Sequence, residues 1–354
     1  MKDKIMFKKI LAVVIALVMT LTVTACAGEK KESSLDDSTT TQTDVALEPS
    51  SGSEDGEKER AEFSLDDCAA MLQESIPEPT YGSVGGEWVA FGLARWGGEV
   101  PQEWFDSYYE QAEEYVINCE GLLNERKYTE YSRVILALTA IGKDPTDVGG
   151  YNLLVPLADY EQTIFQGING PIFALLALDS GSYEIPENVA GTTQATRELY
   201  LEYILDAECP AGGWTLAGSE ADVDITAMAL QALAKYQDRQ DVSEAIDRAL
   251  TVLSELQNDE GGFSAYGSES SESISQVITA LAELGISIDD SRFVKNGNTL
   301  KDRLLDFLTE DGGFRHILDG ESDLMATEQA FYALVALERM ERGENSLYDM
   351  TDVQ

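Results

Sequence analysis

Apolar residues recur at helical spacing in six segments of the chain. The segments read EWVAFGLARWG, YSRVILALTAIG, GPIFALLALDSG, ITAMALQALAKY, SQVITALAELG and QAFYALVALER. Alignment on one leucine places these residues at equivalent positions: Leu93, Leu138, Leu175, Leu233, Leu281 and Leu334. Several segments are apolar nearly all round, which is typical of helices that have neighbours on every side.

Three of these segments are preceded by a second, more amphipathic helical pattern and a Gly-Gly-aromatic turn. The amphipathic patterns are TRELYLEYILDAE, VSEAIDRALTVLSELQ and TLKDRLLDFLTE, and the turns read GGW, GGF and GGF. The repeated unit is therefore helix, turn, helix. Because such pairs bury their faces by stacking on neighbouring pairs, six units predict an all-α ring of inner and outer helices.

The repeat also resembles a known family. Gln257, Gly261 and Phe263 resemble the Q-x-x-x-G-x-W repeat of terpenoid cyclases and protein prenyltransferase β-subunits, with Phe in place of Trp. The other two units have Glu208 and Leu308 at the glutamine position. The resemblance implies an α6/α6 toroid, and a related toroid in cobalamin carriers makes small-ligand capture an expectation.

The N-terminal part predicts export. Four lysines and one aspartate lie in MKDKIMFKK, before the short apolar run ILAVVIALVMTLTV, which is typical of a secretory signal. The residues before Cys26 resemble a bacterial lipobox, although an ordinary cleavage site is the alternative. We therefore expect a signal peptide over 1–26, lipid on Cys26, a disordered acidic tether over 27–62, the toroid over 63–345 and a tail over 346–354. The expected location is the extracellular face of a bacterial membrane.

Charge and composition exclude several classes of function. The formal charge is −41, and removal of residues 1–26, with a net charge of +3, would take it to −44, which disfavours nucleic acid as a partner. His316 is the only histidine, and no cysteine follows Cys209. A prenyltransferase-type zinc site and a Ser-His-Asp arrangement are therefore not expected, and no other metal or cofactor is predicted. With Cys26 set aside, the odd number of remaining cysteines predicts no disulfide framework.

One acidic motif has two interpretations. The run DVDITA resembles the D-x-D-D-T-A motif of class II terpene cyclases, in which the middle aspartate protonates an alkene or epoxide; the resemblance assigns that role to Asp224, with Asp222 beside it. Ile225 replaces the third aspartate, so a neighbour that would raise the acid's pKa is missing. The favoured alternative is helix capping, because Asp222 aligns with Asp323 and Asp224 with Glu272.

The loops after the aromatic turns predict a ligand-binding rim. Candidate binding residues are Trp214, Tyr266, Glu272, Arg315 and Asp323, since aromatic and acidic side chains together suit a polar or cationic ligand. A solvated acidic rim is the alternative, and Trp214 could instead be wedged between helix pairs. The preferred hypothesis is a lipid-anchored protein that binds a small ligand or a surface protein or glycan. The second hypothesis is a cyclase-like enzyme that uses Asp224.

Overall fold

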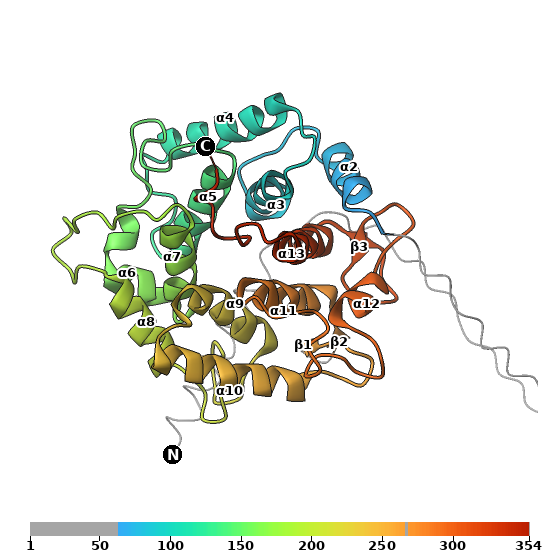
Figure 1. The fold of residues 1–354 in the computed structure, drawn as a ribbon. Helices are drawn as coiled ribbons and strands as arrows, with labels where there is room; N and C mark the ends of the chain where they lie inside the picture. The colour runs from blue at the N-terminus through green and yellow to red at the C-terminus, as the bar shows by residue number, and fades with distance from the viewer. Residues whose placement is uncertain (1–62, 266–267, 354) are drawn as a thin grey trace, which may run out of the picture. The chain divides into compact units, whose positions relative to one another are not determined.

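Six central helices form a closed ring in the computed structural model, which describes residues 63–265 and 268–353. They are α3 (Trp88–Trp96), α5 (Thr129–Ala140), α7 (Asn169–Ser180), α9 (Val223–Leu233), α11 (Ser271–Glu283) and α13 (Leu324–Arg342). Each contacts the next along the chain, and α13 contacts α3, so the ring closes (Figure 1). The six aligned leucines lie one in each helix, and none is more than 3% exposed.

An outer layer of helices surrounds this ring (Figure 1). The described residues form six outer helices: α2 (Leu65–Ser75), α4 (Gln102–Asn118), α6 (Tyr160–Thr163), α8 (Arg197–Asp206), α10 (Gln240–Leu256) and α12 (Leu300–Leu305). In α10, the buried residues Val242, Ala245, Ala249 and Leu253 recur every three or four positions and cover one face. The predicted all-α, two-layer ring is confirmed, and among the described residues no helix is both long and apolar enough to cross a membrane.

The Gly-Gly-aromatic turn at Trp214 joins the outer helix α8 to the following inner helix α9. Trp214 is fully buried, and its Nε1 donates to the carbonyl of Ile204 at 2.7 Å. Its backbone N donates to Oγ1 of Thr226 at 2.9 Å, which ties the turn to α9. Gly213 has φ +71°, a conformation that favours glycine, and a Cβ there would lie 2.9 Å from the same Thr226 oxygen. Trp214 is therefore enclosed in the core, which agrees with its alternative role as a wedge between helix pairs.

The two later turns continue into short hairpins that precede inner helices. Strands β1 (Ser264–Ala265) and β2 (Ser268–Glu269) pair antiparallel before α11, and β3 (Phe314–Arg315) and β4 (Ser322–Asp323) pair before α13. The inner helices then begin with side-chain caps. Asp222 accepts a hydrogen bond from the backbone N of Ile225 at 3.0 Å, and Asp323 accepts one from Ala326 at 2.9 Å. Capping by these two aspartates is confirmed.

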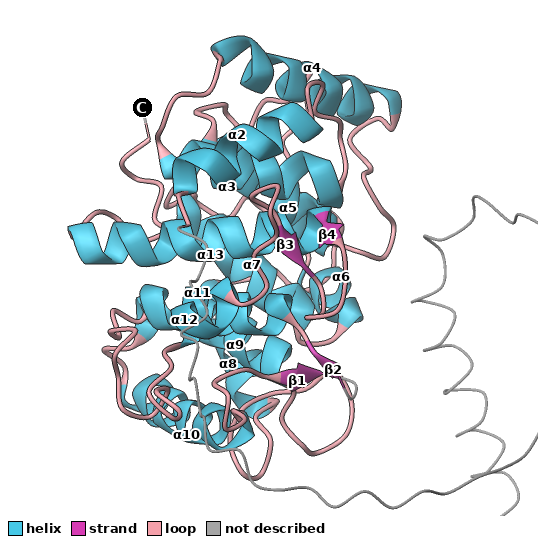
Figure 2. Ribbon diagram, turned by 90° about the vertical axis from the view of Figure 1, so that its right-hand side faces the viewer, coloured by secondary structure: helices cyan, strands magenta, loops and turns pink. Residues whose placement is uncertain are grey.

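The last described residues pack across the other end of the ring, where the inner helices finish (Figures 1 and 2). We call residues 343–353 the strap. The Arg95 guanidinium, at the end of α3, donates to the backbone carbonyls of Ser346, Leu347 and Asp349 and pairs with Asp352 at 2.8 Å. Residues 346–353, suggested by the sequence as a tail, are thus packed onto the ring.

Some predictions fall outside the described residues. These are the signal peptide over 1–26, the lipid on Cys26, the tether over 27–62 and the binding role of Tyr266. Cys68, Cys119 and Cys209 are described, and all three are free thiols. Burial raises the pKa of the Cys68 thiol to about 12, so this thiol stays protonated and unreactive at neutral pH.

Candidate functional site

A cavity of about 450 Å³ opens at the end of the ring where α9, α11 and α13 begin. We call it the acidic cavity. Its lining residues come from the first two turns of these helices and from the segments that precede α11 and α13: Asp224, Met228, Ser268, Ser270, Glu272, Gln276, His316, Met325 and Gln329. Two carboxylates and one imidazole therefore meet in a cavity that also has amide, hydroxyl and thioether groups. None of these described lining residues is a lysine or arginine.

Asp224 is the unusual acid of this cavity. It lies in the first turn of α9, where its Oδ1 is buried and has no hydrogen-bond partner within the described part of the chain. The pKa of Asp224 is raised to about 6, mainly by burial; the nearby Asp222 and Glu272 add to the rise, and a hydrogen bond from the Ser273 side chain opposes it. The side chain therefore carries a charge at neutral pH without the solvation that an exposed carboxylate has.

Glu272 and His316 form the second polar feature. The Nδ1 of His316 lies 2.8 Å from both carboxylate oxygens of Glu272, although the two residues come from different repeats. The Glu272 side chain is 12% exposed, and that of His316 is 57% exposed, so the imidazole lies at the mouth of the cavity. The imidazole thus gives Glu272 a direct polar partner, whereas Asp224 has no cationic side chain paired with it among the described residues.

Amide and hydroxyl groups fix the inner wall. Nε2 of Gln276 donates to Oε1 of Gln329 at 2.9 Å and to the hydroxyl of Tyr332 at 2.5 Å. These bonds join α11 to α13 and leave the polar side chains in set positions. Burial raises the pKa of Tyr332, and Glu328, Asp224 and Glu272 are near enough to raise it further.

Glu328 adds a third buried carboxyl near this wall. Its Oε2 accepts a hydrogen bond from the backbone N of Gly85 at 3.1 Å, whereas its Oε1 has no partner in the described structure. Burial raises the pKa of Glu328 to about 8, with Glu87 and Asp323 contributing. Glu87 itself pairs with Arg133 at 2.9 Å. The interior of this end of the ring is therefore rich in acids, of which only some have a cationic partner.

The structure brings only some of the predicted site residues together. Asp224 and Glu272 line the acidic cavity, whereas Asp222 and Asp323 cap the helices beside it. Arg315 donates to the carbonyls of Leu308 and Leu318 within its own hairpin region and does not line the cavity. The binding role predicted for Arg315 therefore has no support in the cavity's lining.

Sequence reasoning missed His316 as a partner of Glu272, and it missed Gln276, Gln329 and Glu328. One signal was available: polar residues interrupt the apolar inner helices in SQVIT and ATEQAF. A polar side chain that a helix buries needs a hydrogen-bond partner or a cavity. No group of three or more Asp, Glu, His or Cys side chains suited to a metal ion occurs in the described residues.

Comparison with solved structures identifies the architecture. A protein geranylgeranyltransferase-I from Candida albicans, complexed with GGPP, matches with a TM-score of 0.53 and 13% identity, covering 81% of this chain and 95% of the other. An unsaturated glucuronyl hydrolase from Bacillus sp. GL1 gives 0.52 and 13%, covering 81% and 97%. A type II terpene cyclase from Scytonema, in complex with geranylgeranyl dihydroxybenzoate, gives 0.51 and 13%, covering 78% and 97%.

The chain folds as an α/α toroid. The structures similar to it include a prenyltransferase and a terpene cyclase, as the sequence resemblance implied, and also a glycan-degrading hydrolase. No family model matches the chain, and no curated protein does. At 13% identity these similarities show the fold alone. Evidence for the function of the toroid therefore comes from its own cavities.

Proposed function

We propose that the toroid binds a small organic cation in the acidic cavity. The observation that carries the proposal is the buried, unpartnered Oδ1 of Asp224 beside a second carboxylate, in a cavity whose described lining includes no lysine or arginine. A bound organic cation would supply the missing counter-charge, and a hydroxyl or N–H group on the same ligand would supply the missing donor. The volume of about 450 Å³ is in the usual range for a small-molecule site.

The other lining groups fit the same class of ligand. Met228 and Met325 offer polarizable thioether chains for the alkyl part of a ligand. The Nε2 of Gln329 and the hydroxyl of Ser268 offer hydrogen bonds to a polar substituent. Because solved structures similar to this chain include a glucuronyl hydrolase and a terpene cyclase, the fold is compatible with a sugar-like or a prenyl-like ligand. In both cases the carboxylates favour a ligand that also carries a cationic group.

Export of the toroid belongs to the same proposal. The apolar run before Cys26 and the lipobox-like residues support a lipid-anchored protein on the outer face of a bacterial membrane, joined by an acidic tether. A protein with a formal charge of −41 also attracts cations from its surroundings. Capture of a cationic solute outside the cell is therefore the role that the sequence and the cavity both favour.

Choline and its neutral isostere 3,3-dimethylbutan-1-ol test the proposal. Calorimetric titration of the full-length chain should show choline binding at least about tenfold more tightly than the alcohol, because only choline has a charge for Asp224. An Asp224→Asn variant should lose that preference. Asp222→Asn is the matched control, since asparagine caps a helix as well as aspartate does. Equal binding of choline and the alcohol, or an unchanged preference in Asp224→Asn, would contradict the proposal.

A second candidate is acid catalysis by Asp224 on an alkene. One observation favours it: burial raises the pKa of Asp224 to about 6, so part of the population is protonated near neutral pH. The carboxyl proton would pass to an alkene carbon, leaving a carboxylate and a carbocation, and a proton lost from the cyclised product would restore the acid. The polar lining and Ile225 make this the weaker candidate. Turnover of geranylgeranyl dihydroxybenzoate that Asp224→Asn leaves unchanged would eliminate it.

A further inference from the structure

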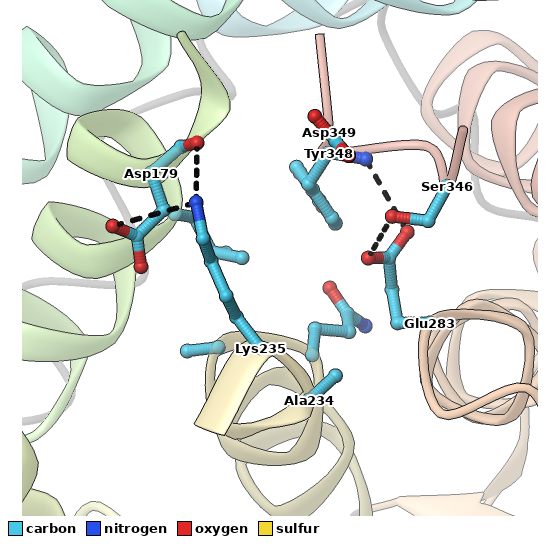
Figure 3. A pocket seen from close by; sticks show the side chains of 10 residues that line it. Asp179, Ala234, Lys235, Glu283, Ser346, Tyr348 and Asp349 are labelled. Carbon is cyan, nitrogen blue, oxygen red and sulfur yellow. Dashed lines mark hydrogen bonds and ion pairs between the residues drawn. The ribbon is translucent and has the colours of Figure 1, made fainter. Parts of the chain in front are cut away.

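A second cavity, of about 180 Å³, lies at the opposite end of the ring beneath the strap. We call it the strap cavity. Its walls come from the final turns of α7, α9 and α11, from the 3-10 turn that follows α9, and from the strap. Figure 3 shows Asp179 with Lys235 on one side and Glu283 with Ser346 on the other. The strap residues Tyr348 and Asp349 complete the wall.

Gln231 presents an acceptor that the protein does not use. This side chain is 3% exposed, lines the strap cavity, and has an Oε1 with no hydrogen-bond partner in the described structure. Its Nε2 donates to the backbone carbonyl of Gln276 at 3.1 Å and to the side-chain Oε1 of Gln276 at 3.0 Å. Because a backbone carbonyl only accepts, the amide of Gln231 cannot be reversed. Its oxygen is therefore the atom left for the cavity.

Lys235 presents a cationic donor from the same region of the chain. Its Nζ donates to the backbone carbonyl of Asp179 at 3.1 Å and lies 3.9 Å from the carboxylate of Asp179. That carboxylate already has closer partners, since Arg197 lies at 2.6 Å and the hydroxyl of Tyr236 at 2.6 Å. An ammonium group has three N–H donors. Lys235 therefore retains capacity for an acceptor in the cavity.

The strap fixes the remaining wall. Ser346 Oγ donates to Glu283 at 2.7 Å, and the backbone N of Tyr348 donates to the other oxygen of Glu283 at 3.3 Å. The carboxylate of Asp349 accepts hydrogen bonds from Thr351. Both carboxyl groups thus have partners, and both favour the positive end of a dipolar ligand over its negative end.

We propose that the strap cavity is a second binding site, for a small zwitterion with an ammonium and a carboxylate group, such as a short amino acid. The ammonium donates to Oε1 of Gln231, and the carboxylate accepts from Nζ of Lys235. The volume of about 180 Å³ corresponds to about six waters at roughly 30 Å³ each, which suits a ligand of this size. The site lies at the other end of the ring from the acidic cavity and does not depend on the function proposed there.

L-alanine, lactate and alaninol are a matched set of probes for this site, because lactate lacks the ammonium group and alaninol lacks the carboxylate. Calorimetric titration of the full-length chain should show L-alanine binding at least about tenfold more tightly than either analogue. Gln231→Met and Lys235→Met should each weaken L-alanine binding by about tenfold or more. Lys235 is half exposed at its side chain, and Asp179 keeps Arg197 and Tyr236, so this variant should stay folded.

Two controls separate this site from other effects. Lys127→Met removes an exposed lysine elsewhere and should leave L-alanine binding unchanged, as should Asp224→Asn in the acidic cavity. The proposal is overturned if L-alanine fails to bind at about 10 mM, which would indicate a cavity that holds water only. Equal binding of all three probes, or full binding by both Gln231→Met and Lys235→Met, would overturn it as well.

Discussion

The two ends of the toroid are built on the same six helices but differ in what closes them. At the end where the inner helices begin, hairpins and capping side chains surround an open cavity of about 450 Å³ that contains carboxylates. At the other end, the strap covers a cavity of about 180 Å³ and is held by Arg95 and Arg339. The acidic end therefore takes its chemistry from the first turns of the repeated inner helices, whereas the other end is closed by the strap, which lies outside the repeats.

The charged side chains at the two ends also differ in whether they have partners. Arg95 and Arg339 at the strap end both pair with Asp352, at 2.8 and 2.6 Å, and their other N–H groups reach backbone carbonyls. At the acidic end, Asp224 and Glu328 each retain a buried oxygen without a partner in the described residues. Fully paired groups stabilise a fold, whereas unpaired ones cost stability and are typical of functional sites.

The largest expected effect is at the strap end. Arg95→Met should lower the free energy of unfolding by about 3 to 5 kcal/mol, because it leaves buried strap carbonyls without donors and Asp352 with one partner fewer. Urea unfolding of the full-length chain measures the change. Arg342→Met removes an exposed arginine that pairs with Glu338 within one helix, and it should cost less than about 0.5 kcal/mol. Similar losses in the two variants would show that the strap is not held as described.

A smaller effect with the opposite sign is expected at the acidic end. Burial raises the pKa of Glu328 to about 8, so the folded state holds this proton more tightly than the unfolded state does. Its contribution to stability is therefore present at acidic pH and is lost as the pH rises toward 8. Glu328→Gln cannot ionise and should be more stable than the unmodified chain by about 2 kcal/mol near pH 8.5.

This gain should shrink to zero or reverse near pH 4, where the glutamate is protonated in both states. Denaturant unfolding at the two pH values measures it. Glu110→Gln, at an exposed position of α4, is the control and should show no comparable change between them. A Glu328→Gln variant with the same relative stability at both pH values would contradict a raised pKa at this site.

The smallest expected effect is at the strap end, at Ser346. Ser346→Ala removes the hydroxyl that donates to Glu283 and should cost about 1 kcal/mol near pH 8. Burial raises the pKa of Glu283 to about 7, so the carboxyl is protonated near pH 5, where the lost bond is weaker and the cost should fall. Ser75→Ala, at an exposed position, is the matched control. If the loss of stability in Ser346→Ala did not depend on pH, the hydrogen bond from Ser346 would not be coupled to the ionisation of Glu283, which would contradict this prediction.

The sequence predicted the frame well because the frame depends on local patterns. The six aligned leucines identified the inner helices, and the Gly-Gly-aromatic turns identified the places where Trp214 and its equivalents pack. The caps at Asp222 and Asp323 also follow from residues within a few positions of each other. Such short-range features can be inferred from one sequence.

The cavities could not be predicted in the same way, because their residues are far apart in the chain. His316 meets Glu272 across 44 positions, and Arg95 reaches Ser346 across 251. Nothing near Leu347 or Tyr348 in the sequence shows that the ring will bury them, since their partners lie on α3 and α11. The acid at Asp224 was found through its motif, but its missing partner is visible only in the folded chain.

Asp224 is the central residue of the proposed function, as an anionic group that lacks a partner until a cation binds. Carbon-13 NMR of the labelled carboxyl, titrated with pH in the full-length chain, measures its pKa directly. We expect a pKa near 6 without ligand, mainly because of burial, and a fall of at least about one unit in saturating choline, because a bound cation favours the charged form. An ordinary pKa without ligand, or a pKa that choline leaves unchanged, would contradict it.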